Sequence, residues 1–179
     1  SLVHLDLSRN AAFSGEIPVT LALTDLTELI LSHNRFTGNV PSSLGLMAFK
    51  LLHLDQNEFS GTVPDGIITT TIQELLLHDN RLTGSWNSSA TPETAPNLRI
   101  VTLYDNQITG DTDQMCSLVT QGNLKVLAVD LDKVVCTCCT SELPPDTPVD
   151  SGGATTVPVS SPPTVTLPSV PTLAPTSET

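Results

Sequence analysis

The sequence is poor in basic and aromatic residues. Its 179 residues include 7 Lys and Arg against 19 Asp and Glu, which gives a formal net charge of −12, and only one Trp, one Tyr and four Phe. The basic residues are scattered, which argues against the clustered positive surface that nucleic-acid binding requires. With so few rings, the core must be aliphatic. We interpret the acidity as solubility, with attraction to a cationic partner or Ca²⁺ as the alternative.

The chain also lacks a long apolar run. No stretch approaches the ~20 residues that cross a membrane as a helix, so we expect membrane association only through segments outside this sequence. It opens on Ser1 without a signal peptide, and the first repeat leucine is already Leu2. We therefore expect a piece of a longer protein, whose earlier repeats and N-terminal cap are missing.

One pattern recurs through most of the chain. Asn10, Asn34, Asn57, Asn80 and Asn106 are separated by 24, 23, 23 and 26 residues, and apolar residues lie eight, five and three positions before each. A sixth unit has Asp132 at the asparagine position. Each L-x-L has the period of a short strand, and such strands bury their leucines only by stacking into a parallel sheet. The asparagine amide is suited to bonding backbone groups of the turn that follows.

Later positions of each unit repeat as well. A second apolar set is expected to fill the next layer of the core, and a glycine in each unit suits a bend. The apolar set is Phe13, Phe36, Phe59, Leu82 and Ile108, and the glycines are Gly15, Gly38, Gly61, Gly84 and Gly110.

These units resemble the leucine-rich repeat in its plant-type extracellular form. The stretch 27–41 reads T-E-L-I-L-S-H-N-R-F-T-G-N-V-P and the stretch 53–64 reads H-L-D-Q-N-E-F-S-G-T-V-P, close to L-x-x-L-x-L-x-x-N-x-F-S-G-x-I-P. The resemblance covers residues 1–133 and implies an α/β-type solenoid. Its expected form is a curved stack of about six repeats of 23–26 residues, with a short parallel sheet on the concave face, where ligands usually bind.

The fourth and fifth units depart from this pattern. Trp86 and Asn87 replace the V-P pair, and Asp111-Thr112-Asp113 replaces the end of the fifth unit. Asn87-Ser88-Ser89 is a sequon in a loop that we expect at the surface, so Asn87 is a glycosylation candidate. The Asp-rich run 105–113 does not have the spacing of an EF-hand and is interpreted as repeat plus loop.

Four cysteines lie around the end of the repeats, in a region 134–143 that we expect to cap the solenoid together with Cys116. Pairing Cys116 with Cys138 leaves Cys136 and Cys139 as a C-x-x-C bridge, whereas the other two pairings need a vicinal or a C-x-C bridge, both strained. The first pairing is therefore preferred. A zinc site is the alternative, although no histidine lies nearby.

The ending also resembles the cap of leucine-rich repeat proteins from diatoms and related algae, which close on A-D-C followed by V-x-C-x-C-C-T-x-C. Here Leu131 stands at the position of the first of those cysteines and Glu142 at the position of the last. The two departures are consistent with the joint loss of one bridge, so the bridge pattern of that family does not carry over directly.

Residues 144–179 have a different composition. These 36 residues hold nine prolines, eight threonines, five serines and no basic residue. Such proline density excludes helix and internal sheet, so we expect a disordered tail. It would act as a plain linker or as an O-glycosylated stalk.

The strand positions that the repeat leaves free form the expected binding surface. Side chains six, four and two places before each asparagine should face outward and create a mixed surface, apolar in the middle and acidic at the rim, suited to protein recognition. The candidate residues are Glu28, Ile30, His53, Asp55, Glu74, Leu76, His78, Thr102 and Tyr104.

Asp55, His78 and Tyr104 are expected to be neighbours on adjacent strands. Three interpretations compete: a hydrogen-bonded surface ladder, a binding hot spot at Tyr104, and a metal-binding or catalytic pair. The register places no serine or cysteine nucleophile beside His78. His78 and Asp55 are too few ligands for a metal, although His53 and Asp79 are near. The ladder is preferred.

Taken together, the sequence predicts a secreted or cell-surface module that binds a protein or a glycan, with no enzymatic activity and no cofactor. The cysteines, the sequon and the tail agree on an oxidising setting. Two alternatives remain: the ectodomain of a receptor-like kinase that continues beyond this sequence, and a structural protein of a wall or surface coat. Ice binding would need a flat, regular threonine array, which the outward positions lack.

Overall fold

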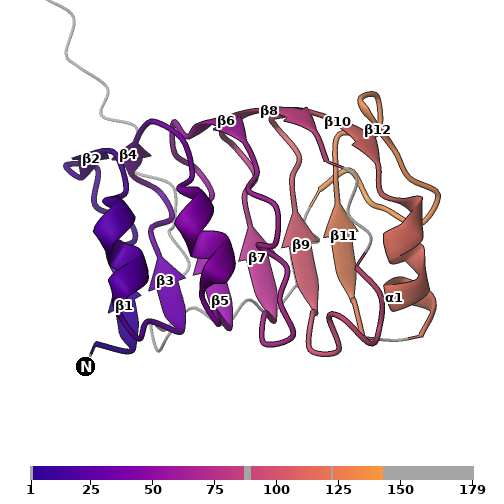
Figure 1. Ribbon diagram of the computed structural model, residues 1–179. Coiled ribbons are helices and arrows are strands. Elements are labelled where there is room, and N and C mark those ends of the chain that lie inside the picture. Colours follow the sequence, from indigo (N-terminus) through magenta and orange to yellow (C-terminus); the bar gives the residue numbers. More distant parts are fainter. Residues whose placement is uncertain (1, 87–89, 122, 143–179) are drawn as a thin grey trace, which may run out of the picture.

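The computed structural model describes residues 2–86, 90–121 and 123–142, and in this part the chain winds into a solenoid whose turns follow one another in sequence order (Figure 1). One wall is a six-stranded parallel sheet, the first sheet. Neighbouring strands pair without any shift of the repeat register. The expected leucine-rich solenoid is confirmed. The strands are β1 (His4–Asp6), β3 (Glu28–Ile30), β5 (Leu51–His53), β7 (Glu74–Leu76), β9 (Ile100–Thr102) and β11 (Val126–Ala128).

The middle residue of each of these strands points into the main core. Leu29, Leu52, Leu75 and Val101 are all 0 % exposed. Full burial of such a side chain stabilises the fold by roughly 1.5–3 kcal/mol. A slip of one residue would turn this row to the other face, so the leucine spacing sets the register.

A second, four-stranded parallel sheet follows the asparagine turns and was not predicted from the sequence. Leu82 and Ile108 of the second apolar set lie in this sheet, and Phe59 directly precedes one of its strands; Phe59 and Leu82 are 0 % exposed. The rings of Phe13, Phe36 and Phe59 stack along the solenoid with centroids 6.3 and 6.1 Å apart. Its strands, in spatial order, are β12 (Val134–Val135), β10 (Gln107–Asp111), β8 (Arg81–Ser85) and β6 (Ser60–Thr62), with β2 (Ser14–Gly15) and β4 (Arg35–Phe36) paired separately.

The repeat glycines have the backbone conformation that was expected of them. Gly61 has φ +72°, and a Cβ at this position would lie 2.4 Å from Oδ1 of Asn39 in the preceding unit. Both the left-handed backbone and the close neighbour therefore require glycine.

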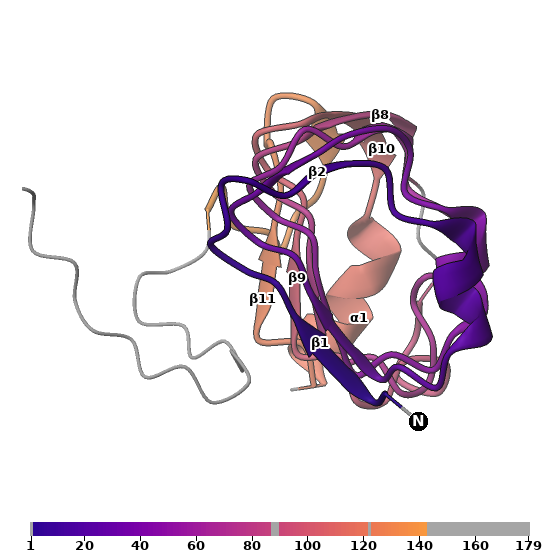
Figure 2. The same ribbon diagram turned by 90° about the vertical axis from the view of Figure 1, so that its left-hand side faces the viewer.

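Short helices form the wall opposite the first sheet (Figure 2). The 3-10 helices η1 (Val19–Leu23) and η2 (Ser42–Leu46) begin directly after Pro18 and Pro41, where a missing backbone N–H costs nothing. The fifth unit forms η3 (Asp113–Met115) and the helix α1 (Cys116–Thr120). No helix in the described residues is long and apolar enough to cross a membrane.

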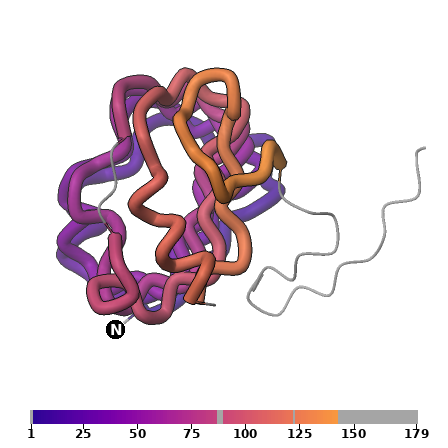
Figure 3. The backbone as a smooth tube through the Cα atoms, turned by 90° about the vertical axis from the view of Figure 1, so that its right-hand side faces the viewer, coloured from indigo at the N-terminus to yellow at the C-terminus, as the bar shows by residue number. Residues whose placement is uncertain are grey.

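The two ends of the solenoid differ. At the first repeat, Leu2, Val3 and Phe13 are 54, 49 and 40 % exposed. At the other end the chain folds back over the last repeat (Figure 3), and Thr140 forms a parallel bridge with Ala128 of β11. The second sheet continues through Val135, so it crosses the boundary expected after residue 133.

Candidate functional site

The predicted surface lies on the face of the first sheet that turns away from the main core, called the concave face below. Two rows of outward residues run across the sheet. The first row joins Glu28, Leu51 and Glu74, and the second joins Ile30, His53, Leu76 and Thr102. Backbone bonds extend the ladder past the strands, for example from the N–H of His33 to the carbonyl of Asp55. The structure therefore brings the nine predicted side chains together on one face.

Most of these side chains are far more buried than the sequence suggested. Glu28 and Tyr104 are half-buried, whereas the other seven are between 0 and 5 % exposed. The buried members are Ile30, His53, Asp55, Glu74, Leu76, His78 and Thr102.

Asp55, His78 and Thr102 form a buried polar ladder across the strands together with Ser32. The hydroxyl of Ser32 donates to Oδ1 of Asp55 at 2.6 Å, and Oδ2 of Asp55 lies 3.9 Å from Nε2 of His78. On the other side, Nδ1 of His78 is hydrogen-bonded to the hydroxyl of Thr102 at 2.8 Å. Because buried polar groups are costly unless paired, this ladder stabilises the face while fixing the orientation of His78.

His78 also stacks on Tyr104, the single tyrosine of the chain, with ring centroids 4.6 Å apart. Burial lowers the pKa of His78 below its ordinary value, and the nearby carboxylates of Asp55 and Asp79 offset only part of this effect. The ring therefore carries no charge at neutral pH and presents a flat surface beside the tyrosine.

Two further histidines pair with glutamates of the next strand. Nδ1 of His4 and Oε2 of Glu28 lie 2.6 Å apart, and Nε2 of His53 and Oε2 of Glu74 lie 3.1 Å apart. Arg99 approaches Glu74 at 3.9 Å. These contacts give both strand glutamates a partner on the preceding strand.

A second apolar cluster lies on the concave face, separate from the main core. Leu76, Ile100, Val126 and Ala128 are 4, 2, 6 and 0 % exposed, and Tyr104 packs against them. The cluster spans strands β7, β9 and β11. It was predicted only in part, because Ile100, Val126 and Ala128 occupy outward positions of the repeat, where exposed side chains were expected.

The rim of the face is exposed and acidic. The residue before each repeat asparagine has a left-handed backbone, with φ +54° at both Asp79 and Asp105. Burial, together with repulsion from Asp105 and Asp55, raises the pKa of Asp79, while His78 opposes the shift. The two carboxylates thus border the stacked rings.

The catalytic and metal interpretations gain little support from this geometry. No serine or cysteine was expected beside His78, but Thr102 does place a hydroxyl there. Neighbouring backbone N–H groups, such as that of Leu103, are held in the sheet and cannot stabilise an oxyanion. Among the described residues, the potential metal ligands that gather in a group of three are Cys116, Cys136 and Cys138.

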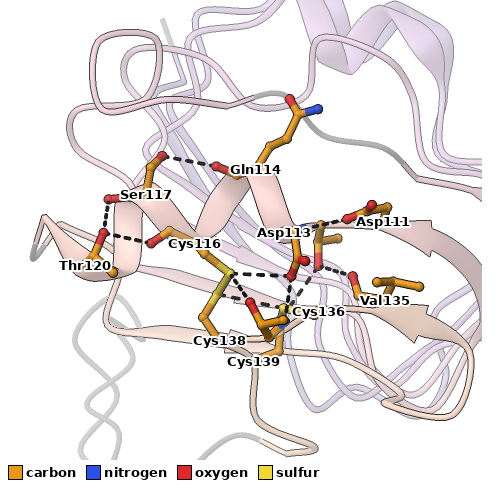
Figure 4. Close-up of a disulfide and its surroundings, with 12 residues drawn as sticks. Asp111, Asp113, Gln114, Cys116, Ser117, Thr120, Val135, Cys136, Cys138 and Cys139 are labelled. Atoms are coloured by element: carbon orange, nitrogen blue, oxygen red, sulfur yellow. Dashed lines mark hydrogen bonds between the residues drawn. A yellow bond between two sulfur atoms is a disulfide. The ribbon is translucent and has the colours of Figure 1, made fainter.

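Those cysteines are bridged (Figure 4). Cys116 of α1 pairs with Cys138, and Cys136 pairs with Cys139, which is the pairing preferred from the sequence. The sulfurs are thus not free to hold zinc. Asp113 reinforces the cap by accepting a hydrogen bond from the N–H of Thr137, so the departure at 111–113 serves the attachment of the cap.

Asp130 of the sixth repeat accepts two backbone N–H groups of the last asparagine turn. Its carboxylate accepts the N–H groups of Asp105 and Asn106, which in earlier repeats bond to main-chain carbonyls, and Lys133 contacts it at 3.1 Å. Burial would raise the pKa of Asp130, but these hydrogen bonds outweigh it and lower the pKa. Asp132, which stands at the asparagine position by spacing, is exposed, and the acid that meets these N–H groups is Asp130.

Two predictions lie outside the described residues. The glycosylation candidate Asn87 falls in 87–89, and the tail falls in 143–179. Both stay predictions.

Comparisons with known proteins agree with the repeat assignment. Residues 25–47 match the Leucine Rich Repeat family. The ectodomain of the receptor kinase SOBIR1 from Arabidopsis thaliana is 22 % identical, with a TM-score of 0.63 over 74 % of this chain and 72 % of that chain. Pollen Receptor Kinase 3 is 23 % identical, with a TM-score of 0.66 over 80 % and 68 %. No curated protein matches the sequence.

A third structure contains a bound ligand. The ectodomain of the Arabidopsis receptor kinase HAESA, in complex with an N-terminally extended IDA peptide hormone, is 26 % identical with a TM-score of 0.54. The match covers 65 % of this chain but 19 % of that one, so this chain corresponds to about a fifth of the receptor ectodomain. Together the comparisons show the fold.

Proposed function

We propose that this chain, a leucine-rich repeat protein with plant-type repeats, is a non-enzymatic recognition module that binds a peptide segment of another protein along its concave face. The proposal places it outside the cell or at the cell surface. The two disulfides of the cap support this setting, because such bridges persist in oxidising compartments.

The stacked His78–Tyr104 pair is the observation that carries the proposal. A half-buried tyrosine, held in place by a neighbouring ring and flanked by apolar side chains, has the features of a binding hot spot. Few rotatable bonds remain to be fixed when a ligand packs on it, so little entropy is lost.

The surroundings of Tyr104 favour a ligand that combines apolar and basic residues. Leu76 and Ile100 supply apolar contact, while the exposed carboxylates of Asp79 and Asp105 border the rings. Such a border of like charge favours cationic partners and speeds their association at low salt. The peptide ligand of the HAESA ectodomain is a precedent for a peptide on this fold. A glycan remains the alternative ligand.

The receptor-kinase alternative concerns what lies beyond this sequence. The SOBIR1 and Pollen Receptor Kinase 3 likenesses, both under 25 % identity, support the fold alone. A membrane span and kinase motifs in the full gene would support that alternative, and it is compatible with the same binding face.

A displayed library of random peptides, panned against the full chain, tests the proposal. Enriched peptides would then be measured by calorimetry against the wild type, Tyr104→Ala and Leu46→Ala. Leu46, on η2 of the opposite wall, is 89 % exposed and is the matched control for a lost apolar contact. We expect at least about tenfold weaker binding for Tyr104→Ala, the scale of a hot-spot truncation, and unchanged binding for Leu46→Ala. Weaker binding by Leu46→Ala with unchanged binding by Tyr104→Ala would refute binding on the concave face.

A further inference from the structure

A cavity lies in the wall opposite the first sheet, between the third and fourth repeats. Its volume is about 490 Å³, which is within the range of small-molecule pockets. It is separate from the concave face, because its lining comes from segments that follow the second sheet. The lining includes Val63, Asp65 and Ile68 of the third repeat and Ser85, Trp86 and Thr94 of the fourth.

The third repeat departs from the earlier ones where this cavity begins. In the second repeat η2 follows Pro41, and its Leu44 packs in the main core. The third repeat has Pro64 at the equivalent position, but Gly66 follows with φ +76°, a left-handed backbone that cannot continue a right-handed helix. The chain turns there instead, which leaves the wall hollow beside the fourth repeat.

Trp86 forms the aromatic side of the cavity. It occupies the repeat position at which Ile17 and Val40 are only 4 % exposed, but its larger ring is half-buried and packs against the main core. Its backbone N–H donates to the carbonyl of Thr109 at 2.8 Å, which anchors it at the end of β8. An indole in this position provides a flat apolar surface and an N–H that can donate.

Two polar side chains on the cavity are available to a ligand. In the part of the chain that the structure describes, the carboxylate of Asp65 and the hydroxyl of Ser85 have no hydrogen-bond or ion-pair partner, and both residues are exposed. Thr94 differs, because its hydroxyl already accepts the N–H of Thr91 at 2.8 Å. The carboxylate can accept hydrogen bonds, and the serine hydroxyl can donate or accept them. A ligand can therefore bond both groups without breaking a bond within the protein.

We propose that this cavity binds a neutral saccharide, with one sugar ring packed on the indole of Trp86 and its hydroxyls bonded to Asp65 and Ser85. A sugar ring has an apolar face of C–H groups and an edge of hydroxyls. It therefore fits a flat aromatic surface that lies beside hydrogen-bonding side chains. The cavity supplies both, and Val63 and Ile68 extend its apolar side. The site goes beyond the proposed function, since it lies on another wall and needs no peptide.

The charge and the ring content of the cavity argue against other ligand classes. Among the described residues that line it, Asp65 is the only charged one and Trp86 the only aromatic one. An anionic ligand, such as a phosphate or a uronic acid, would be repelled by the carboxylate. A quaternary ammonium ligand is typically held in a cage of aromatic rings, which one indole does not form. A neutral sugar is the class that matches the lining.

Fluorescence titration of the full chain tests the site directly, because Trp86 is the single tryptophan and its emission reports on its own surroundings. The neutral probes are cellotetraose, xylotetraose, mannotetraose and chitotetraose. Tetragalacturonic acid is the anionic probe, and choline is the cationic one. The protein is produced in a host that adds no glycan, so that no sugar on Asn87 competes. We expect at least one neutral probe to shift the emission saturably and neither charged probe to do so.

Asp65→Asn should weaken binding of that probe at least about tenfold, because a hydrogen bond to a charged acceptor is replaced by a weaker one. Asp25→Asn, which changes an exposed acid before β3, is the matched control and should leave the affinity unchanged. No response to any neutral probe would overturn the proposal. Equal affinity of the wild type and Asp65→Asn, or a response to a charged probe alone, would also overturn it.

Discussion

The ring of His78 lies on the ring of Tyr104, with centroids 4.6 Å apart and planes inclined by 19°. This contact joins the two parts of the concave face. His78 belongs to the buried polar ladder through Thr102, and Tyr104 belongs to the apolar cluster. Protonation of His78 is therefore expected to disturb both parts.

Acidification should destabilise the fold through His78. Burial keeps the pKa of this ring below its ordinary value in the folded chain. As the pH falls through about 6.5, the unfolded chain binds a proton that the folded chain resists, so the free energy of unfolding decreases. We expect His78→Gln to lose less Tm than the wild type between about pH 7.5 and pH 5.

The exposed His33→Gln is the control, because glutamine already occupies the equivalent position at Gln56. It should change the pH profile far less than His78→Gln, because repulsion from His33 is only a minor cause of the lowered pKa of His78. A profile of His78→Gln identical to the wild type would contradict the role of His78.

Asp79→Asn should stabilise the protein at neutral pH. Burial and the carboxylates of Asp105 and Asp55 raise the pKa of Asp79, so its ionisation above that pKa costs folding free energy. Asparagine removes the charge and tolerates the left-handed backbone. The gain should stay below about 1 kcal/mol, because the side chain is exposed, and should vanish near pH 3, where the carboxyl is protonated.

Urea unfolding at both pH values measures this effect. Asp65→Asn, an exposed acid away from the stacked rings, should change nothing. If Asp79→Asn lowered the stability at neutral pH, the repulsion between Asp79 and the carboxylates of Asp105 and Asp55 would be contradicted.

The substitutions Asn80→Ala and Asn34→Ala are expected to lower the free energy of unfolding by different amounts. The amide of Asn80 donates to the carbonyls of Leu54, Leu77 and His78, and its oxygen accepts the N–H of Phe59. Asn34 makes the same three donations, but its buried oxygen has no hydrogen-bond partner. Since each buried group left unpaired costs about 1–3 kcal/mol, Asn80→Ala should cost about 1 kcal/mol more than Asn34→Ala.

Urea unfolding of the two variants gives this difference directly. The oxygen of Asn34 lacks a partner because of an extra residue in the first repeat. There the N–H of Phe13 donates to the carbonyl of Asn10 and not to the oxygen of Asn34. If both variants lost the same free energy of unfolding, the hydrogen bond accepted by the Asn80 oxygen would contribute nothing to stability.

The two disulfides should contribute unequally to stability. Cys116–Cys138 closes a loop with a sequence separation of 22, whereas Cys136–Cys139 closes one of 3. From loop closure, removal by paired Cys→Ser substitution should cost about 3 kcal/mol for the first and about 2 kcal/mol for the second. Thermal unfolding under non-reducing conditions compares the two variants, and a larger loss for the second would contradict the role of Cys116 in attaching the cap.

The period of the sequence predicted the first sheet, because leucine burial and asparagine capping recur at fixed offsets. Leu29, Leu52 and Leu75 lie at one register, as the spacing requires. The second sheet was not predicted. Its pairing follows from the stacking of whole turns, and residues such as Thr62 and Thr83 carry no alternating pattern of their own.

The concave face was predicted in position but not in burial. Register alone places His78 between Asp55 and Tyr104, and the structure retains that order. The exposure of a side chain depends on what packs over it, which the repeat does not encode. Asp130 shows the same limit, since its role depends on a hydrogen bond formed between repeats.

Photo-crosslinking tests the central claim, binding of a peptide at the concave face, most directly. A benzoylphenylalanine replaces Tyr104 in one variant and the exposed Leu46 in the other, and each is irradiated with a peptide enriched by panning. We predict that the peptide becomes attached at position 104 and not at position 46. Attachment at position 46 alone would contradict binding on the concave face.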